Sequence, residues 1–148
     1  KKGSMPHYSG GGGLSSTVKD YGRILQVLLN GGSANGVTLL KSQTVNAMFR
    51  SHIGSIEPTA LETAMPNISN TADLSFGNKA TFGLGLLLHT EGIDGGRRPF
   101  TGSWAGLFNS YYWIDRETGI YGIFGAQLLP FYDAVTIETL LQFEQAVY

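Results

Sequence analysis

The chain has 148 residues, of which 42% are hydrophobic and 14% charged, and its formal net charge is -1. This composition excludes a disordered chain and is enough to bury the core of one globular domain. The only basic doublets are Lys1 with Lys2 and Arg97 with Arg98, so the sequence lacks the basic surface that nucleic acid requires. We therefore expect one compact unit, residues 1–148, with small molecules as its partners.

The composition also argues against several kinds of site. Without cysteine, the chain cannot form disulfides, thiolate nucleophiles or cysteine-ligated zinc sites. The three histidines, His7, His52 and His89, form no His-x-x-x-His pair, so we predict no metal and no cofactor. The longest apolar stretches, at 84–88 and 120–126, are much shorter than the roughly 20 residues of a membrane-spanning helix, so no membrane association is expected. The opening KKGSMPHYSG has no secretory leader pattern and begins as though cut from a longer sequence.

A glycine run at residues 10–13 leads into the first predicted helix. In LSSTVKDYGRILQVLLNGG the apolar residues recur at helical spacing, and Gly31 and Gly32 supply the C-terminal stop. Polar residues occupy the opposite side, which indicates an amphipathic surface helix of about four turns. The apolar positions are Val18, Tyr21, Leu25, Leu28 and Leu29.

Ser16 and Lys19 in this helix match Ser-x-x-Lys, the nucleophile signature of serine β-lactamases and penicillin-binding proteins. On a helix that opened at Ser16, Lys19 would lie one turn along and could act as a base. A catalytic pair needs burial, however, and this helix is polar on one side. Ser16 or Thr17, followed by Asp20, is typical of a helix cap. We therefore interpret Ser16 as part of a cap and not as the nucleophile.

The next segments predict an extended stretch, a second helix and a long loop. Residues 37–40 favour extended structure, and a helix capped by Ser42 follows and ends near His52. Residues 53–80 are rich in Pro, Ser, Asn, Thr and Gly and have no sustained period, which predicts a long irregular loop. An Asn-x-Ser sequon at Asn67 would carry a glycan only in a secreted protein.

After Thr81 the pattern changes to strands. TFGLGLLLHTEG, LFNSYYWID and IYGIFGAQLL each predict one strand, and a tight turn at residues 115–119 joins the last two. A helix follows Pro130, with Asp133 as its cap. The predicted fold is α+β, with a three-stranded antiparallel meander flanked by helices. Because such a meander leaves two unpaired edges, we expect strands from outside this chain to complete the sheet.

The polar and aromatic residues of this half have simple structural interpretations. His52 and His89 have no visible acidic partner, so satisfied structural roles are expected. Arg97 and Arg98 indicate a solvated turn, with anion binding as the minor alternative. The run YYWID, which begins at Tyr111, alternates between two faces of a strand, so at least one of its aromatic side chains should lie in the core. Glycines within the strand segments indicate twist or close packing.

Several segments together resemble the C-terminal half of the class C β-lactamase-like serine hydrolases, which are similar to penicillin-binding proteins. They keep the family's order over nearly the whole chain, and they are SGGGGLSSTVKDYGRILQVLLNGG, GVTLLKSQTV, FGLGL and TGSWAGLFNSYYWIDRETGIYGIFGAQLLPF. The family includes carboxylesterases, D-amino-acid peptidases and fungal acyltransferases (transesterases). The resemblance implies a β-lactamase/transpeptidase-like fold and chemistry through an acyl-enzyme.

In that family the nucleophile and its lysine lie on a buried helix well upstream, and a Tyr-x-Asn motif supplies a tyrosine base. The resemblance therefore implies that the working serine lies outside this chain and that only the third active-site motif falls within it. It also implies a partner, the N-terminal half of the same protein, either covalently continuous or as the other piece of a nicked chain. We expect the chain alone to be inactive.

Two registers compete for the third motif. Residues 100–103 imitate Lys-Thr-Gly-Ser with phenylalanine in place of lysine, whereas residues 104–106 imitate Trp-Gly-Gly with alanine in the middle. We favour the second register, because its spacing to Asp115 matches the short loop of the esterase-like members.

In the favoured register the strand edge presents a backbone N-H to the developing oxyanion, which requires close approach of the main chain and small residues nearby. By resemblance, the donor would be the backbone N-H of Leu107, next to Gly106. Trp104, Ala105 and Phe108 would bind the substrate.

Two departures from the β-lactamase pattern bear on the substrate. Neither register keeps the cationic side chain that holds a substrate carboxylate, and the start of the last helix carries Asp133 without an arginine. Ester or thioester chemistry on neutral acyl groups is therefore favoured over β-lactam hydrolysis, with hydrolysis and transfer both open. The alternative is a non-catalytic binding or assembly module in which Trp104 and the aromatic strand form a ligand or partner surface.

Overall fold

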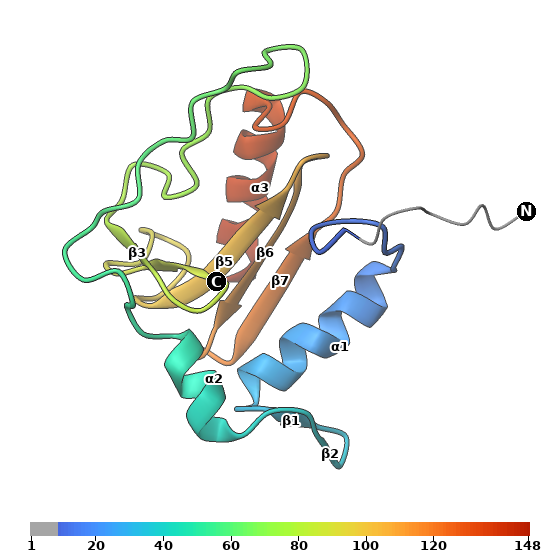
Figure 1. Cartoon of the computed structure of the whole chain (residues 1–148), viewed down its shortest axis with the longest axis vertical. Coiled ribbons are helices and arrows are strands. Elements are labelled where there is room, and N and C mark those ends of the chain that lie inside the picture. Colours follow the sequence, from blue (N-terminus) through green and yellow to red (C-terminus); the bar gives the residue numbers. More distant parts are fainter. Residues whose placement is uncertain (1–8) are drawn as a thin grey trace, which may run out of the picture.

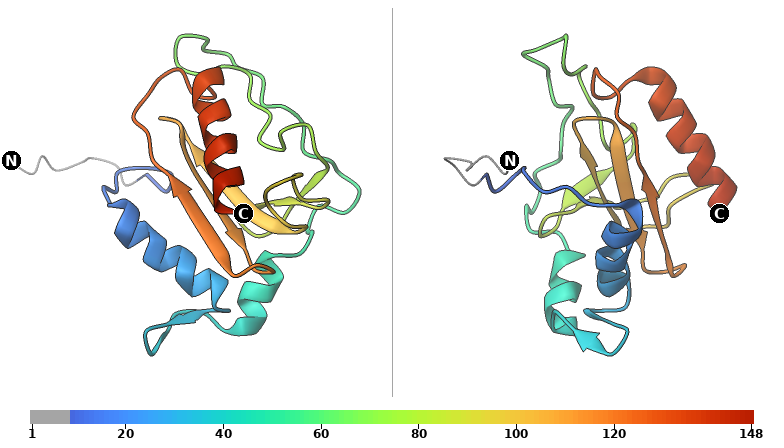
Figure 2. Two further views of the ribbon diagram at one scale, coloured as in Figure 1. Left: turned by 180° about the vertical axis from the view of Figure 1, so that it is seen from behind. Right: turned by 90° about the vertical axis from the view of Figure 1, so that its right-hand side faces the viewer.

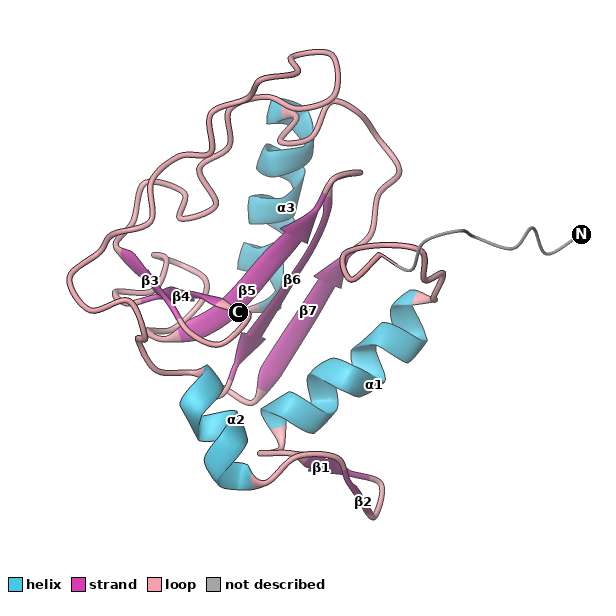
Figure 3. Cartoon of the chain, viewed as in Figure 1, coloured by secondary structure: helices cyan, strands magenta, loops and turns pink. Residues whose placement is uncertain are grey.

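A five-stranded antiparallel sheet forms the centre of the computed structural model, which describes residues 9–148, and helices lie on both faces of the sheet (Figures 1 and 3). Lys1, Lys2 and His7 lie outside the described residues. The elements in chain order are α1 (Val18–Leu29), β1 (Ser33–Ala34), β2 (Val37–Thr38), α2 (Ser42–Met48), β3 (Ala80–Phe82), β4 (Leu87–His89), β5 (Thr101–Gly106), β6 (Ser110–Asp115), β7 (Ile120–Phe124) and α3 (Ala134–Val147).

The sheet is a sequential meander in the order β3-β4-β5-β6-β7, and β1 pairs separately with β2. The α+β class with an antiparallel sheet flanked by helices is therefore confirmed, but the predicted number of three strands is wrong. The segment 81–92 contains two strands, because the chain turns between Phe82 and Leu87, where Gly85 has a φ of 77°. Thr101–Gly106 is a strand in its own right and pairs with both β4 and β6.

α1 begins as predicted, with Thr17 as its cap. The Thr17 hydroxyl oxygen accepts a hydrogen bond from the backbone N-H of Asp20 at 3.1 Å and donates to the Asp20 carboxylate at 3.0 Å. The helix ends before Gly31 and Gly32, both at positive φ. A Cβ at Gly32 would lie 2.1 Å from the carbonyl oxygen of Leu40, so only glycine fits this close approach.

α2 differs from its prediction at both ends. Its N-cap is Lys41, without a side-chain hydrogen bond, and Ser42 is the first helical residue, so the Ser42 cap is wrong. The helix ends at Met48 and not near His52. Its last carbonyl group, that of Met48, accepts a hydrogen bond from the backbone N-H of Leu84 at 3.2 Å, and this contact with the β3–β4 turn replaces a further helical turn.

α3 follows the predicted cap. The Asp133 carboxylate accepts hydrogen bonds from the backbone N-H and the hydroxyl of Thr136, both at 2.9 Å. No helix in residues 9–148 has the length and apolar character needed to cross a bilayer.

The side chains of β6 point alternately into two cores, one on each face of the sheet. Tyr112 and Ile114 pack on the side of α1 and α2, whereas Tyr111 and Trp113 pack on the side of α3. Figure 2 shows α3 on one side of the sheet and α1 with α2 on the other. A Cβ at Gly122 would lie 2.1 Å from the Trp113 ring, so this glycine provides the close packing expected of strand glycines.

The two edges of the sheet differ. At the β3 edge, the backbone N-H of His52 donates to the carbonyl of Phe82 at 2.9 Å. No strand of the described residues pairs with the outer edge of β7. Residues 49–79 contain no helix or paired strand. The isolated bridges of Leu61 with Ala72 and of Ser69 with Phe131 organise them, together with local turns and backbone hydrogen bonds to the Asp73 carboxylate.

Candidate functional site

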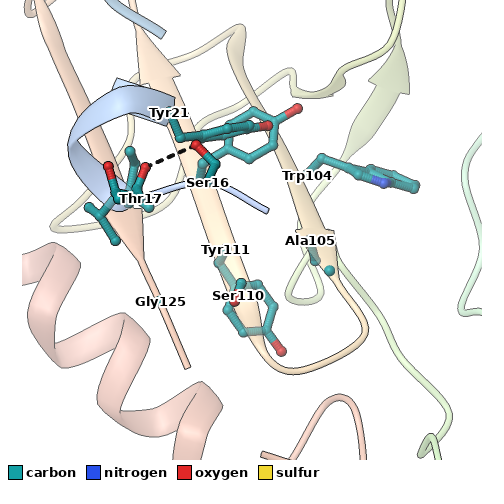
Figure 4. A pocket seen from close by; sticks show the side chains of 12 residues that line it. Ser16, Thr17, Tyr21, Trp104, Ala105, Ser110, Tyr111 and Gly125 are labelled. Atoms are coloured by element: carbon teal, nitrogen blue, oxygen red, sulfur yellow. Dashed lines mark hydrogen bonds between the residues drawn. The ribbon is translucent and has the colours of Figure 1, made fainter. Parts of the chain in front are cut away.

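A hollow of about 340 Å³ lies between the start of α1 and the ends of β5, β6 and β7 (Figure 4). This volume falls within the range of small-molecule sites. The wall contains hydroxyl groups and aromatic rings but no charged side chain. Its residues are Ser16, Thr17, Val18, Tyr21, Trp104, Ala105, Gly106, Ser110, Tyr111, Tyr112, Ile123 and Gly125.

The structure brings three of the five predicted site residues together in this wall. Trp104, Ala105 and Gly106 lie along the last half of β5 and line the hollow. Leu107 and Phe108 lie in the turn between β5 and β6 and are not part of the wall. Within residues 9–148, the N-H of Leu107 forms no backbone hydrogen bond. This is compatible with donation to an oxyanion, and that role stays a prediction.

Trp104 forms one side of the hollow. Its ring packs edge-on against Phe82 with 5.3 Å between the centroids, and the residue is 37% exposed. Trp104 also lines a smaller cavity of about 50 Å³ with Pro58 and Leu61 of the long loop. The indole therefore separates the main hollow from the space beneath that loop.

Asn109 holds the β5–β6 turn in place, and the sequence interpretation did not single it out. The residue is fully buried at a φ of 60°. Its side-chain amide donates to the carbonyls of Leu128 and Pro130 at 3.0 and 2.8 Å, and its side-chain oxygen accepts from the Tyr111 hydroxyl at 2.9 Å. Asparagine tolerates this left-handed conformation, but the segment LFNSYYWID was predicted to be a strand throughout, so the turn at Asn109 was missed.

Two neighbouring tyrosines of β6 line the hollow, and the hydroxyl of one of them, Tyr111, already donates to Asn109. Burial raises the pKa of Tyr112 well above its usual range, and the nearby Tyr21 ring, 5.4 Å away between centroids, adds to this shift. Burial also raises the pKa of Tyr111. Both hydroxyls are therefore neutral at neutral pH and suited to hydrogen bonding, whereas a general base should have a pKa near the working pH.

Ser16 lies in the wall of the hollow, which the sequence interpretation missed. Its hydroxyl donates to the carbonyl of Thr17 at 3.4 Å (Figure 4). Because α1 begins at Val18, Ser16 precedes the helix, and the described hydrogen bonds include none between Ser16 and Lys19. Thr17 is the cap, so Ser16 is a neighbour of the cap at an exposed position.

The interpretation of Arg97 as part of a solvated turn is wrong, although Arg98 is exposed as expected. Arg97 is only 3% exposed, and its Nε donates to both carboxylate oxygens of Glu144 at 2.8 and 2.9 Å. The segment folds against α3 at Gly96, where an added Cβ would lie 2.9 Å from the Glu144 carboxylate. A side chain at this position would therefore disturb the ion pair.

His52 and His89 both form hydrogen bonds within the fold. His89 is fully buried, and burial, followed by the charge of Arg97, lowers its pKa to about 3. Its Nε2 lies 3.0 Å from the hydroxyl oxygen of Ser103, but its Nδ1 has no partner among the described residues, so it is only partly satisfied. His52 pairs through Nε2 with the carbonyl of Ala47 at 2.7 Å. Residues 9–148 contain no cluster of three or more potential metal ligands.

Comparison with protein-family models matches residues 1–145 to the family described as Beta-lactamase. Among curated proteins, the chain is 33% identical over 128 residues to lovastatin esterase of Penicillium rubens, covering 82% of this chain and 30% of that protein. It is 30% identical over 129 residues to acyltransferase calJ of Penicillium decumbens, covering 82% of this chain and 29% of that protein. The chain thus spans about three tenths of the length of these curated relatives.

The fold is similar to that of a solved relative. Unliganded simvastatin synthase (LovD) of Aspergillus terreus superimposes with a TM-score of 0.64 at 26% identity, over 86% of this chain and 33% of that chain. The selenomethionyl form of the same enzyme gives a TM-score of 0.68 at 25% identity, over 86% of this chain and 32% of that chain. The helices and antiparallel sheet described above are therefore those of a β-lactamase-like protein.

Proposed function

Because the chain belongs to the beta-lactamase family over residues 1–145, we propose that it is the C-terminal part of a serine hydrolase or acyltransferase that acts on esters or thioesters. Esterase and acyltransferase relatives support this chemistry. In the proposal, the chain supplies the third active-site motif and part of the acyl pocket, and the nucleophilic serine lies outside it.

The uncharged hollow beside residues 104–106 carries the proposal. Its wall offers rings and neutral hydroxyls and no cation that could hold a substrate carboxylate. Such a lining suits an uncharged acyl group, because an unpaired charge entering an apolar site loses its hydration without compensation. A neutral ester or thioester therefore fits better than an anionic β-lactam.

The proposed reaction proceeds in two transfers. The serine oxygen forms a bond to the substrate carbonyl carbon, the bond from that carbon to the leaving oxygen or sulfur breaks, and the serine proton passes to the leaving group. The acyl group then moves to water or to an acceptor alcohol, whose proton returns to serine. The backbone N-H of Leu107 stabilises the negative oxygen in both steps, a contribution of about 3 to 4 kcal/mol for one such donor.

The remainder of the protein would complete this site. The chain covers 30% and 29% of two curated relatives, and the outer edge of β7 has no strand partner in the described residues. We place the nucleophile, its lysine and the additional strands in the N-terminal part of the same protein, which would remain covalently joined or bound after nicking.

Turnover of p-nitrophenyl butyrate tests the proposal. We expect activity from the longer protein that carries this chain, no activity from the 148-residue chain alone, and activity that survives Ser16→Ala in the longer protein. Turnover by the isolated chain that disappears with Ser16→Ala would overturn the assignment of the nucleophile. A longer protein that binds neutral esters without turning them over would support the binding-module alternative.

Substitution of Trp104 tests the acyl pocket within the active protein. Trp104→Ala opens the wall toward the cavity beneath the long loop, so we expect a change of about 10-fold or more in the kcat/KM ratio between octanoyl and butyryl esters. Trp104→Phe should keep most of the wild-type preference. An unchanged ratio in Trp104→Ala would remove this residue from the pocket.

A further inference from the structure

Four polar side chains from four different segments meet beneath β5 on the α3 face of the sheet. Arg97 comes from the connection between β4 and β5, Glu144 from α3, His89 from β4 and Ser103 from β5. All four are at least 96% buried, with exposed fractions of 3%, 1%, 0% and 4%. We refer to them as the Arg97 cluster.

Hydrogen bonds connect the members of the Arg97 cluster in a chain. The Nε of Arg97 donates to both oxygens of Glu144, its backbone N-H donates to one of them at 3.2 Å, and its terminal NH1 donates to Nε2 of His89 at 2.9 Å. The same Nε2 lies 3.0 Å from the hydroxyl oxygen of Ser103. Because the guanidinium can only donate, Nε2 of His89 is an acceptor, and the Ser103 hydroxyl must be the donor.

The surroundings keep the guanidinium in one orientation. Its carbon lies 5.4 Å from the centre of the Phe76 ring and 5.5 Å from the centre of the Trp113 ring. Both distances are within the range of cation–π contact. Arg97 is therefore fixed by two rings and by the bifurcated contact of its Nε with Glu144.

The Arg97 cluster lies next to residues 104–106 of β5 in two ways. Ser103 immediately precedes Trp104 on β5, and its side chain points to the opposite face from Trp104 because strand side chains alternate. Arg97 also lines a cavity of about 10 Å³ together with Trp104 and Ala105. Arg97 is thus linked through His89 to Ser103 of β5, and it lies directly beside the predicted substrate-binding residues.

We propose that the Arg97 cluster is a positioning device that fixes the register and tilt of residues 104–106, and through them the Leu107 amide and the Trp104 wall. The inference rests on the proposed function for its catalytic consequence, but its structural part concerns only this chain. Arg97, Glu144, His89 and Ser103 are positioning residues, because none of them lines the main hollow.

A double substitution separates positioning from simple stability. Removing both charges with Arg97→Met and Glu144→Leu leaves no unpaired buried charge, and such replacements of buried ion pairs are often neutral for stability. We expect the double variant of the longer protein to keep its melting temperature within a few degrees, while kcat for p-nitrophenyl butyrate falls about 10-fold or more and KM changes little. Arg97→Lys alone should not keep wild-type kcat, because one ammonium cannot contact both Glu144 and Nε2 of His89 as the guanidinium does.

A spectroscopic readout tests the inference without any activity. In protein labelled with fluorotryptophan, the Trp104 signal can be assigned by its loss in Trp104→Phe. We expect Ser103→Ala, which removes only the hydroxyl link to His89, to shift or broaden that signal. Val45→Ala is the matched control, because Val45 is fully buried on the opposite face and its truncation destabilises the fold without touching the cluster.

The possible outcomes distinguish the two proposals. A longer protein without ester turnover would defeat the proposed function, and the Trp104 signal would still decide the positioning role. An unchanged Trp104 signal in Ser103→Ala, or a double variant with wild-type kcat, would overturn the positioning role while leaving the function intact. A Trp104 signal that shifts equally in Val45→Ala would also overturn it, because general destabilisation would then explain the change.

Discussion

α1 and α2 cover one face of the sheet with hydrocarbon, whereas α3 covers the other face with hydrocarbon and buried charge. On the first face the buried core is apolar and contains no charged group, and its residues are Leu25, Val45, Phe49, Leu86, Leu88 and Ile114. On the second face Tyr111, Trp113 and Leu140 surround an ion pair, a neutral histidine and a carboxylate.

The buried carboxylate of Asp115 shows how the second face tolerates charge. Burial alone would raise the pKa of Asp115, but hydrogen bonds from the backbone N-H groups of Thr118 and Arg98 and from the Tyr148 hydroxyl hold it below its usual value. The ion pair and the Asp115 carboxylate on this face depend on specific hydrogen-bond partners. The core on the α1 and α2 side depends mainly on packing, so the free energy of unfolding lost on truncation there should increase with the side-chain volume removed. On the α3 face the loss should depend on whether a buried polar group keeps its partner.

Glu144→Gln gives the largest expected difference between the faces. The substitution leaves the Arg97 guanidinium buried without its counter-charge, so we expect a loss of about 3 to 5 kcal/mol in the free energy of unfolding. Val45→Ala on the apolar face should lose about 2 kcal/mol. Urea unfolding of both variants measures the difference, and a smaller loss in Glu144→Gln than in Val45→Ala would contradict the contrast between the faces.

Lowering the pH should reduce the free energy of unfolding, because His89 on the α3 face is buried in its neutral form. Its pKa is lowered from 6.5 to about 3 in the folded state. Above pH 6.5 both states are neutral and the stability is fully present. As the pH falls below 6.5, His89 binds a proton in the unfolded state but stays neutral in the folded state. The free energy of unfolding therefore decreases progressively down to about pH 3. The slope should approach 1.4 kcal/mol per pH unit, or about 2 to 3 kcal/mol between pH 6.5 and 4.5.

Urea unfolding as a function of pH, with His89→Gln as the control, tests this expectation. The charged groups around His89 are Arg97 and Asp73, and the pKa of Asp73 is also lowered. A carboxylate with a lowered pKa loses its stabilising contribution only as the pH approaches and passes below 3.8, so the window from pH 6.5 to 4.5 isolates the histidine. Equal slopes for the wild type and His89→Gln in that window would exclude the proposed origin.

The sequence predicted those parts of the fold that depend on contacts between residues close together in the chain. Local signals were sufficient for α1, α3 and their caps, because Thr17 with Asp20 and Asp133 with Thr136 bond within one helical turn. The apolar alternation of β6 predicted its two faces. The end of α2 could not be predicted in this way, because it depends on the long-range contact of the Met48 carbonyl with Leu84. The division of segment 81–92 had a local signal in Gly85, but the strand glycines were interpreted as marks of twist or close packing.

Long-range contacts likewise limited the prediction of the candidate site. The run at residues 104–106 was recognisable from its resemblance to a known motif, and the structure places it in the wall of the hollow. The burial of Arg97 was not recognisable from the sequence, because its partner Glu144 lies 47 residues away. The doublet of Arg97 and Arg98 also has the composition of an exposed turn. The same limit applied to Ser16, whose neighbours across the hollow come from strands that begin far along the chain.

Substitutions at the start of α1 give the smallest expected effect and return to the Ser-x-x-Lys pattern. Thr17→Ala removes the hydroxyl that accepts from the backbone N-H of Asp20, so we expect a loss of about 1 kcal/mol in the free energy of unfolding. Ser16→Ala should change it by less than about 0.5 kcal/mol, because its exposed hydroxyl makes only a 3.4 Å contact with the Thr17 carbonyl. Urea unfolding of the two variants is the measurement. Equal losses would show that Ser16 shares the capping role, whereas unequal losses leave Ser16 as a residue of the wall whose position follows from the Thr17 cap.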